Sequence, residues 1–215
     1  MRSTRRLGAE DSATRDALLD AALQLLLEEG YASVTSRKVA GRAGLKPQLV
    51  HYYFRTMDEL FLALVRRGSA LGLERQARAL ESETPLRALW AVATDPAGTT
   101  FTTELFALAN HRKAIRAELA AHADEFRKLQ RDALVEVLAS YEVDLGDIPP
   151  AVLPVLVTGL SQILVLEDAL GLSTGHAELR ELVEGWIARY EPASEAAPIE
   201  RRPRARASRT ARPGA

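Results

Sequence analysis

The chain has 215 residues, of which 47% are hydrophobic and 27% charged, close to the averages of globular proteins. This composition excludes a wholly disordered chain, and the lack of cysteine excludes disulfide frameworks, cysteine-based metal sites and a cysteine nucleophile. The formal net charge is −1, yet the window from Gly30 to Met57 holds five basic side chains and no acidic one, so a polyanion could dock there.

The N-terminal segment is polar and charged, without the apolar stretch that directs export, so we expect a cytoplasmic protein. The most apolar stretch, Ala151–Leu166, contains polar residues and ends at two acidic ones. It is shorter than the roughly 18 to 20 apolar residues that a membrane span needs. We therefore expect this stretch to form a helix buried on all sides within the protein, and we expect no membrane partner.

Apolar residues recur at helical spacing along almost the whole chain, and no alternating run requires a strand. Asp11 or Ser12 can cap the first helix and Gly30 can end it, while Thr56, followed three residues later by Glu59, makes a capping box. The sequence from 95 to 98, Asp-Pro-Ala-Gly, predicts a turn. We expect about nine helices, at about 12–29, 35–43, 47–54, 57–80, 85–94, 99–110, 112–140, 150–171 and 175–190.

The predicted fold class is therefore all-α, and composition divides the chain into four segments. Residues 1–11 are expected as a flexible basic arm and 12–57 as a three-helix domain. Residues 58–190 have longer apolar helices with an acidic surface and are expected to bind a ligand and to dimerise. The arginine-, proline- and alanine-rich segment 191–215 is expected as a disordered tail.

Within the three-helix domain, the stretch 35–54 predicts two short helices joined by a tight glycine turn, which is the architecture of a helix-turn-helix. Small or apolar residues occupy the positions where these helices must pack. The opposite positions hold hydrogen-bond donors or flat rings, namely Arg37, Lys46, Gln48, His51, Tyr52 and Arg55. Burial of such a face without partners would be costly, so it must face water or a ligand.

The positions that carry a closer resemblance are Thr35, Val39, Ala40, Ala43, Gly44, Leu45, Val50, Tyr53, Phe54 and Leu60. With them, the stretch 30–60 resembles the N-terminal domain of TetR-family transcriptional regulators. Two positions depart from the family pattern, because His51 stands where a tyrosine is usual and Met57 where a lysine is common. The resemblance implies a helix-turn-helix followed by a helical domain that binds a ligand and forms a dimer.

The resemblance also implies which residues contact DNA: Thr35, Ser36, Arg37, Lys46, Pro47, Gln48, His51, Tyr52 and Arg55. Thr35 and Ser36 would hold a phosphate at the start of a helix. Arg37 and Gln48 would reach base edges, because a guanidinium or an amide can form paired hydrogen bonds with a base. His51 and Tyr52 would mostly touch phosphate and sugar.

The larger domain gives weaker indications of a ligand pocket, since its apolar residues would form the core of any helical bundle. Polar residues inside apolar helices nevertheless match the usual make-up of ligand cavities. The candidate lining residues are Trp90, Phe101, Leu105, Phe106, Phe126, Gln130, Thr158 and Gln162. The predicted partner is an unidentified small apolar effector.

The last two predicted helices have more apolar surface than one small domain is expected to hide, and the family pairs such helices between subunits. The candidate interface residues are Leu153, Val157, Leu160, Leu164, Leu179, Leu182, Val183, Trp186 and Ile187. A two-fold symmetric homodimer would present its two recognition helices about 34 Å apart, which matches successive major grooves of double-stranded DNA.

Enzymatic function is not expected, because the residues around Ser161 do not form a nucleophile elbow and His111 and His122 are too far apart along a helix to share a metal. We expect no cofactor and no metal.

The sequence predicts a repressor that binds a palindromic operator and is released by its effector. In this prediction the helix 57–80 alone connects the two domains. The alternative is a helical small-molecule or lipid carrier, or a scaffold, without DNA contact.

Overall fold

The computed structural model describes residues 3–191, and every regular element within that range is helical. The predicted all-α class is confirmed. The α-helices are α1 Ser3–Glu29, α2 Ser36–Arg42, α3 Pro47–Tyr53, α4 Met57–Leu80, α5 Pro85–Ala93, α6 Pro96–His111, α7 Lys113–Ser140, α8 Leu153–Leu170 and α9 His176–Ile187. Two short 3₁₀ helices, η1 Tyr31–Ser33 and η2 Pro150–Val152, lie between them.

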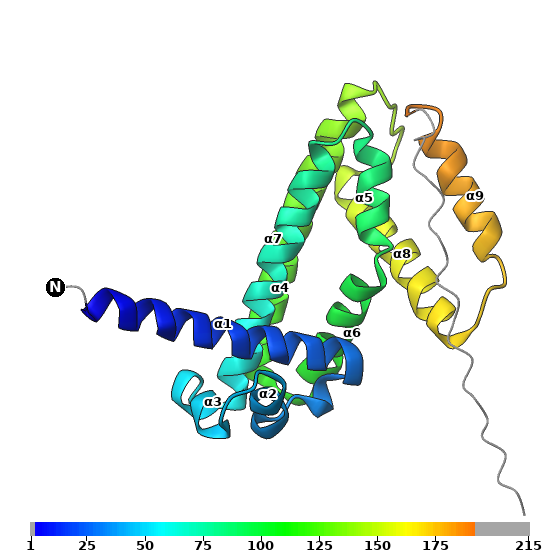
Figure 1. Ribbon diagram of the computed structural model, residues 1–215. Coiled ribbons are helices and arrows are strands. Elements are labelled where there is room, and N and C mark those ends of the chain that lie inside the picture. The colour runs from blue at the N-terminus through cyan, green and yellow to red at the C-terminus, as the bar shows by residue number, and fades with distance from the viewer. Residues whose placement is uncertain (1–2, 192–215) are drawn as a thin grey trace, which may run out of the picture.

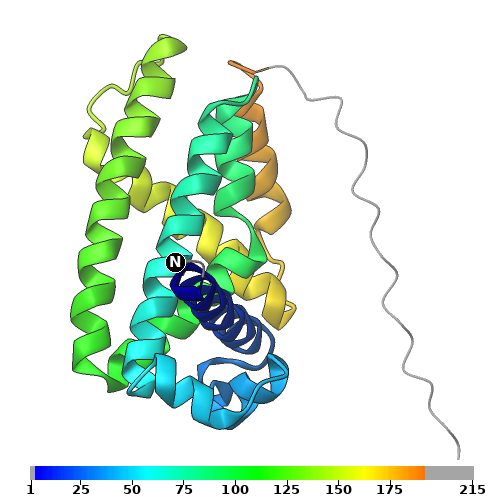
Figure 2. The same ribbon diagram turned by 60° about the vertical axis from the view of Figure 1, so that its left-hand side comes forward.

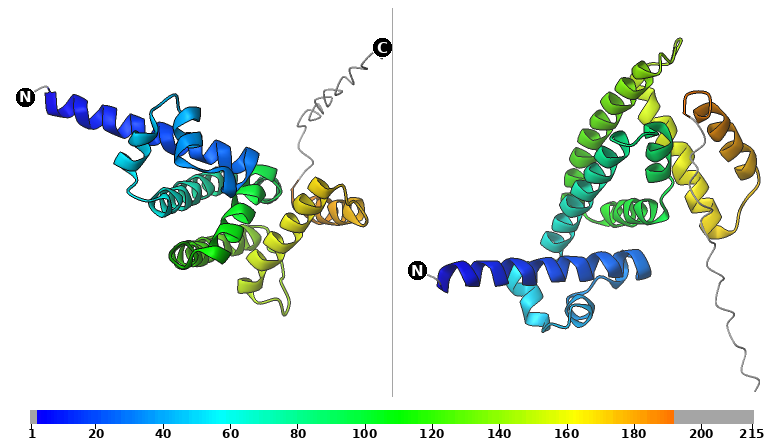
Figure 3. Two further views of the ribbon diagram at one scale, coloured as in Figure 1. Left: turned by 90° about the horizontal axis from the view of Figure 1, so that it is seen from below. Right: turned by 45° about the horizontal axis from the view of Figure 1, so that its top comes forward.

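The helices form two connected layers (Figure 1). α1 lies across the base of the molecule with α2 and α3 on its outer side, and α4 and α7 rise from it side by side. A turned view shows α4 and α7 as two long upright helices, with α5 next to α4 (Figure 2). The right-hand view of Figure 3 shows α1 as a straight helix below the bundle, with α9 at the outer edge. The small unit with α2 and α3 thus projects from one end.

Two helix starts differ from the sequence expectation. α1 begins at Ser3 rather than at Asp11 or Ser12, so the backbone of most of the predicted N-terminal arm continues the helix. This segment contains no proline, and its arginine, leucine, alanine and glutamate residues favour helix. α6 begins at Pro96, because Asp95 accepts a hydrogen bond from Gly98 N at 3.2 Å and acts as an N-cap instead of opening an isolated turn.

The prediction that the apolar stretch 151–166 is buried on all sides is wrong for the single chain. Only Pro154, Ser161 and Leu164 of α8 are buried. By length and composition alone, the segment Pro150–Leu170 could cross a membrane, with a mean hydropathy of 1.7, and 17% of its most apolar window is buried. The apolar side chains of α8 therefore lie partly in the core and partly on the surface of the single chain.

The larger core joins the base of the molecule to the bundle. It contains Leu18 and Leu26 of α1, Leu64 of α4, Leu105 of α6 and Ile115 of α7, none of them more than 1% exposed. Each such side chain contributes about 1.5–3 kcal/mol by leaving water. The core is continuous across the boundary between residues 57 and 58, so the small unit does not have a core separate from that of the bundle.

A second core holds the far end of the bundle together, and a buried carboxylate completes it. Glu191, the first residue of the predicted tail, is only 1% exposed. Its two oxygens accept hydrogen bonds from Leu86 N at 2.6 Å and Arg87 N at 3.0 Å, at the start of α5, and Tyr141 Oη donates to it at 3.0 Å. Glu191 thereby joins the chain beyond α9 to α5 and α7. The rest of the predicted tail, 192–215, lies outside the described residues.

His176 ties the start of α9 to the end of α8. It is 5% exposed, with Nε2 2.7 Å from a carboxylate oxygen of Glu167 and Nδ1 2.8 Å from one of Asp168. These two hydrogen bonds raise the pKa of His176 above its usual value. The bond to His176 in turn lowers the pKa of Asp168, with help from Arg180. Only the imidazolium form of His176 can donate to both carboxylates.

We expect Glu191→Gln to reduce the free energy of unfolding by about 1–3 kcal/mol, because an amide nitrogen replaces one of two buried acceptors. Glu181→Gln, an exposed carboxylate on α9, is the matched control. Urea denaturation followed by circular dichroism measures both. Equal midpoints for the two variants would show that the buried carboxylate does not stabilise this end of the bundle.

We expect the contribution of His176 to stability to depend on pH. Because the pKa of His176 is raised in the folded chain, the stabilisation is fully present below about pH 6.5, the unfolded value, and is lost as the pH rises through the higher folded value. The gap in melting temperature between the wild type and His176→Asn should therefore narrow between pH 6 and pH 9. His51→Asn, on the exposed side of α3, should show no such trend. A constant gap for His176→Asn would contradict the linkage.

Candidate nucleic-acid interface and ligand cavity

α2 and α3 pack as a helix-turn-helix. Thr35 caps α2, since its Oγ1 accepts a hydrogen bond from Lys38 N at 3.3 Å. The turn is closed by a bond from Leu45 N to Ala40 O at 2.8 Å, and Gly44 adopts φ of 68°, a conformation that favours glycine. Burial of Ala40 and of Val50, on the inner side of α3, locks the two helices together.

The outer side of α3 faces solvent. Lys46 stands at its N-cap and Pro47 in its first turn, and Gln48, His51 and Tyr52 are exposed, with Tyr52 at 69%. At the other end, Phe54 is buried and the guanidinium of Arg15 lies 5.1 Å from the centre of its ring. The exposed face of α3 is therefore rigidly presented.

Two of the five basic residues counted in the acid-free window are neutralised by α1. Lys38 Nζ lies 2.7 Å from Glu29, and Arg42 pairs with Glu28 at 2.6 Å and with Glu29 at 3.1 Å. The hydrogen bond from Lys38 lowers the pKa of Glu29.

The number of basic residues in the window therefore overestimates the number of cations that are free to bind a polyanion. The partners Glu28 and Glu29 lie just before the window in the sequence and were not counted with it. The side chains of Arg37, Lys46 and Arg55 form no ion pair within residues 13–191. These three residues, with Gln48, His51 and Tyr52, are called the recognition face below.

The start of α4 differs in detail from the predicted capping box. Thr56 Oγ1 accepts a hydrogen bond from Glu59 N at 3.1 Å, as expected. The Glu59 carboxylate, however, accepts a hydrogen bond from Arg55 N at 2.9 Å, rather than from the backbone N–H of the cap residue. Met57 is partly buried against the larger core. The position where the family commonly has lysine thus serves packing in this chain.

An open cavity of about 520 Å³ lies in the bundle, lined by side chains of α1, α4, α5, α6, α7 and α8. Seven predicted pocket residues line it: Phe101, Leu105, Phe106, Phe126, Gln130, Thr158 and Gln162. Trp90 does not, because it packs instead on the second core, beside Leu86 and Leu138. The volume is within the usual range for small-molecule sites.

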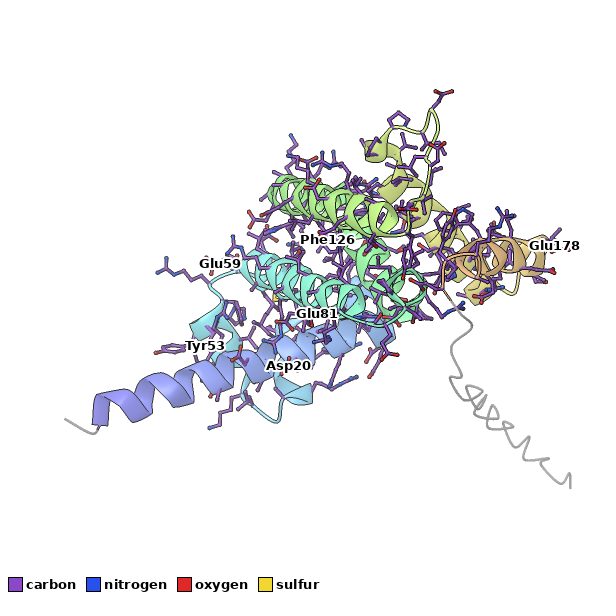
Figure 4. All side chains as sticks on the ribbon, turned by 90° about the horizontal axis from the view of Figure 1, so that it is seen from above. Asp20, Tyr53, Glu59, Glu81, Phe126 and Glu178 are labelled. Carbon is purple, nitrogen blue, oxygen red and sulfur yellow. The ribbon has the colours of Figure 1, made fainter. Side chains whose placement is uncertain are left out.

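Gly68 of α4 makes room for an aromatic ring in the cavity wall. A Cβ atom on Gly68 would come within 2.1 Å of the Phe101 ring, whereas one on Gly72 would meet Phe126 at 3.6 Å, an ordinary contact distance. Phe126 lies between α7 and α4 in Figure 4. A glycine inside a helix costs about 1 kcal/mol relative to alanine, so Gly68 was a readable signal of close packing that sequence reasoning missed.

The cavity and the helix-turn-helix unit share a wall, so α4 is not the sole connection between them. Leu23 and Leu27 of α1 line the cavity. Glu104 of α6 accepts a hydrogen bond from Tyr31 N at 2.7 Å, directly after α1. Arg67 of α4 pairs with two aspartates of α1 at 3.1 and 2.6 Å. The prediction that α4 alone connects the two domains is therefore wrong, since α1 and α6 connect them as well. These contacts join segments that are distant in the chain, and no local sequence pattern indicates them.

The structure separates the predicted interface residues into four groups. Leu160, Leu182 and Trp186 are exposed. Leu164 and Ile187 are buried within the chain, which removes both from any outer surface, and Val157 lines the cavity. The remaining three, Leu153, Leu179 and Val183, are partly buried. Sequence reasoning missed the neighbours of Leu160 on the exposed side of α8, namely Val155, Leu156, Ile163, Leu166 and Leu170.

Comparison with known proteins agrees with this geometry. The family model described as "Bacterial regulatory proteins, tetR family" matches residues 18–64. The HTH-type transcriptional regulator BetI of Rhizobium meliloti is 40% identical over 52 residues, which is 24% of this chain and 26% of that protein. The chain thus matches only about a quarter of the length of this relative.

Solved structures extend the likeness of the fold to most of the chain. A TetR-family regulator from Rhodococcus sp. has a TM-score of 0.66 at 22% identity, covering 83% of this chain and 98% of the other. A transcriptional regulator from Saccharomonospora viridis, solved in complex with choline, has a TM-score of 0.67 at 19% identity, covering 82% and 96%.

The fold and the exposed recognition face define a helix-turn-helix protein with an attached helical cavity domain. More narrowly, residues 18–64 match the family model of TetR-type bacterial regulatory proteins, and the fold of most of the chain is similar to that of TetR-family transcriptional regulators. This is a family of regulators and not of enzymes.

Proposed function

We propose that the chain is a homodimeric repressor that binds a palindromic DNA operator and is released by a small molecule held in the cavity. The observation that carries the proposal is the recognition face. Its three unpaired cations and its exposed amide, imidazole and phenol groups lie on one rigid unit. Cations supply attraction to phosphate, and side chains such as Arg37 and Gln48 supply contacts to base edges.

The exposed side of α8 supports the homodimer. Leu156, Leu160 and Ile163 follow one another at helical spacing and are 38–46% exposed, and Leu182 of α9 is 70% exposed. Exposed apolar side chains that follow one another along a helix in this way mark an interaction site. A second copy of the same surface fits it better than lipid, because α9 also bears several exposed charged residues.

The cavity supports control by a ligand. One of its walls is α1, which packs against α2, and two others are α4 and α6, which both contact α1. The Saccharomonospora viridis neighbour shows that the same fold can hold a small molecule. A ligand that changes the spacing of α1, α4 and α6 would shift the two recognition helices of a dimer relative to each other. Such coupling typically amounts to about 1–3 kcal/mol and is reciprocal, so operator DNA would weaken ligand binding equally.

A second candidate, a ligand carrier without DNA contact, is favoured only by the cavity. Retention on heparin and a gel shift with the DNA upstream of the protein's own gene distinguish the two. A carrier would bind neither, whereas a repressor would bind both and would lose the upstream DNA when its effector is added.

We expect Arg37→Ala to weaken operator binding by about 1–3 kcal/mol and to relax the preference for one base pair in each half-site. Lys46→Ala should weaken binding to all DNA and reduce its salt dependence. Lys128→Ala, an exposed cation on α7, is the control that removes equal charge elsewhere. Fluorescence anisotropy with operator variants, measured over a range of salt, compares the three. An unchanged base preference in Arg37→Ala would assign this residue to phosphate instead.

We expect Leu160→Asp and Trp186→Asp each to give monomers, because a dimer would bury an unpaired carboxylate in an apolar surface. Leu129→Asp, an exposed leucine on α7, is the matched control and should remain dimeric. Analytical ultracentrifugation measures the mass, and the same samples should show reduced operator affinity only for the two monomeric variants. Dimers in both α8 and α9 variants would place the interface elsewhere.

A further inference from the structure

One buried polar group in the wall of the cavity lacks a hydrogen-bond partner. Gln76 of α4 lines it and is 94% buried, being 6% exposed, yet its Oε1 atom has no hydrogen-bond partner. A buried acceptor without a donor costs about 1–3 kcal/mol. An occupant of the cavity, whether a ligand or an ordered water, can supply that donor. The fold therefore keeps this space for something other than its own side chains.

The charged residues that line the cavity are all arginines. Arg75, Arg78 and Arg127 line it together with the imidazole of His122, and none of the described lining residues is Asp or Glu. Two of these four have partners outside the lining, since Arg75 pairs with Asp95 at 2.7 Å and His122 Nε2 lies 3.5 Å from Glu118.

Arg78 and Arg127 differ from the other two because neither forms a hydrogen bond or ion pair within residues 13–191. Both are exposed and also line the cavity, which places them where it opens to solvent. A guanidinium binds carboxylate and phosphate groups through paired hydrogen bonds. A positively charged group such as a quaternary ammonium would meet two unpaired cations in the cavity wall.

We propose that the cavity binds an anionic amphiphile, with its acidic group beside Arg78 and Arg127 and its apolar body between the phenylalanines that pack against α4. The apolar body is matched by Phe101 and Phe126, which line the interior. This inference deepens the proposed function, on which it rests for the view that the cavity holds an effector.

Calorimetric titration of the full-length protein with three ten-carbon probes tests the charge preference. Decanoate, 1-decanol and decyltrimethylammonium have the same apolar chain and differ in the charge of the head group. Decanoate should bind about tenfold or more tightly than decanol, and decyltrimethylammonium more weakly than either. Absence of decanoate binding, equal affinities for the three probes, or a preference for the ammonium compound would overturn the proposal.

Two double variants locate the preference. Arg78→Gln with Arg127→Gln should reduce decanoate affinity to that of decanol and leave decanol affinity unchanged. Lys128→Gln with Arg131→Gln removes the same charge from α7 at positions that do not line the cavity, and should leave both affinities unchanged. All four residues are on or near the surface, so the fold is not at risk. A decanoate preference that survives the first double variant would place the anion site elsewhere.

A gel shift on the same preparations separates this inference from the proposed function. Protein that binds its upstream DNA but does not prefer decanoate would remain a regulator with a different effector. Protein that prefers decanoate but binds no DNA would keep the anion site and lose the repressor function.

Discussion

Burial of the leucines of α1 connects the helix-turn-helix unit to the helical bundle that holds the cavity. Leu18 and Leu26 lie in the same core as Leu64 of α4 and Leu105 of α6, while Leu27, on a neighbouring side of α1, lines the cavity. Close-packed interiors resist continuous deformation and shift between discrete arrangements. Because α1 packs against the helix-turn-helix on one side and forms part of the cavity wall on another, a change in the cavity can reach the recognition face through packing alone.

Charge is divided within the small unit in a way that serves both folding and docking. Glu28 and Glu29, at the end of α1, hold Lys38 and Arg42 of α2 in surface ion pairs. Such exposed pairs contribute little to stability, because water and salt screen them. They do, however, orient α2 against α1, and the cations that remain unpaired lie on the outer side, where a polyanion can approach.

Polar contacts at both ends of α9 add to the burial of Ile187 in holding this helix at the far end of the molecule. His176 ties its start to α8, and Glu191, just beyond its end, caps α5. Between these two points Leu182 and Trp186 remain exposed, and α9 itself lies at the outer edge of the bundle (Figure 3). Figure 4 shows Glu178 of α9 and Tyr53 of α3 at opposite ends of the molecule, so the proposed subunit interface and the proposed DNA contacts are well separated.

The sequence by itself determined the helices, the helix-turn-helix and seven of the residues that line the cavity, because capping residues, glycine turns and apolar spacing act between residues close in the chain. The long helix 57–80 and the tight glycine turn at Gly44 followed directly from such local rules. Only the tertiary structure decided that Glu191 is a buried cap, that Trp90 leaves the cavity wall and that one side of α8 is uncovered. These outcomes depend on partners that are distant in the chain, 105 residues away for Glu191 and Leu86, and no local pattern encodes which distant residues will meet.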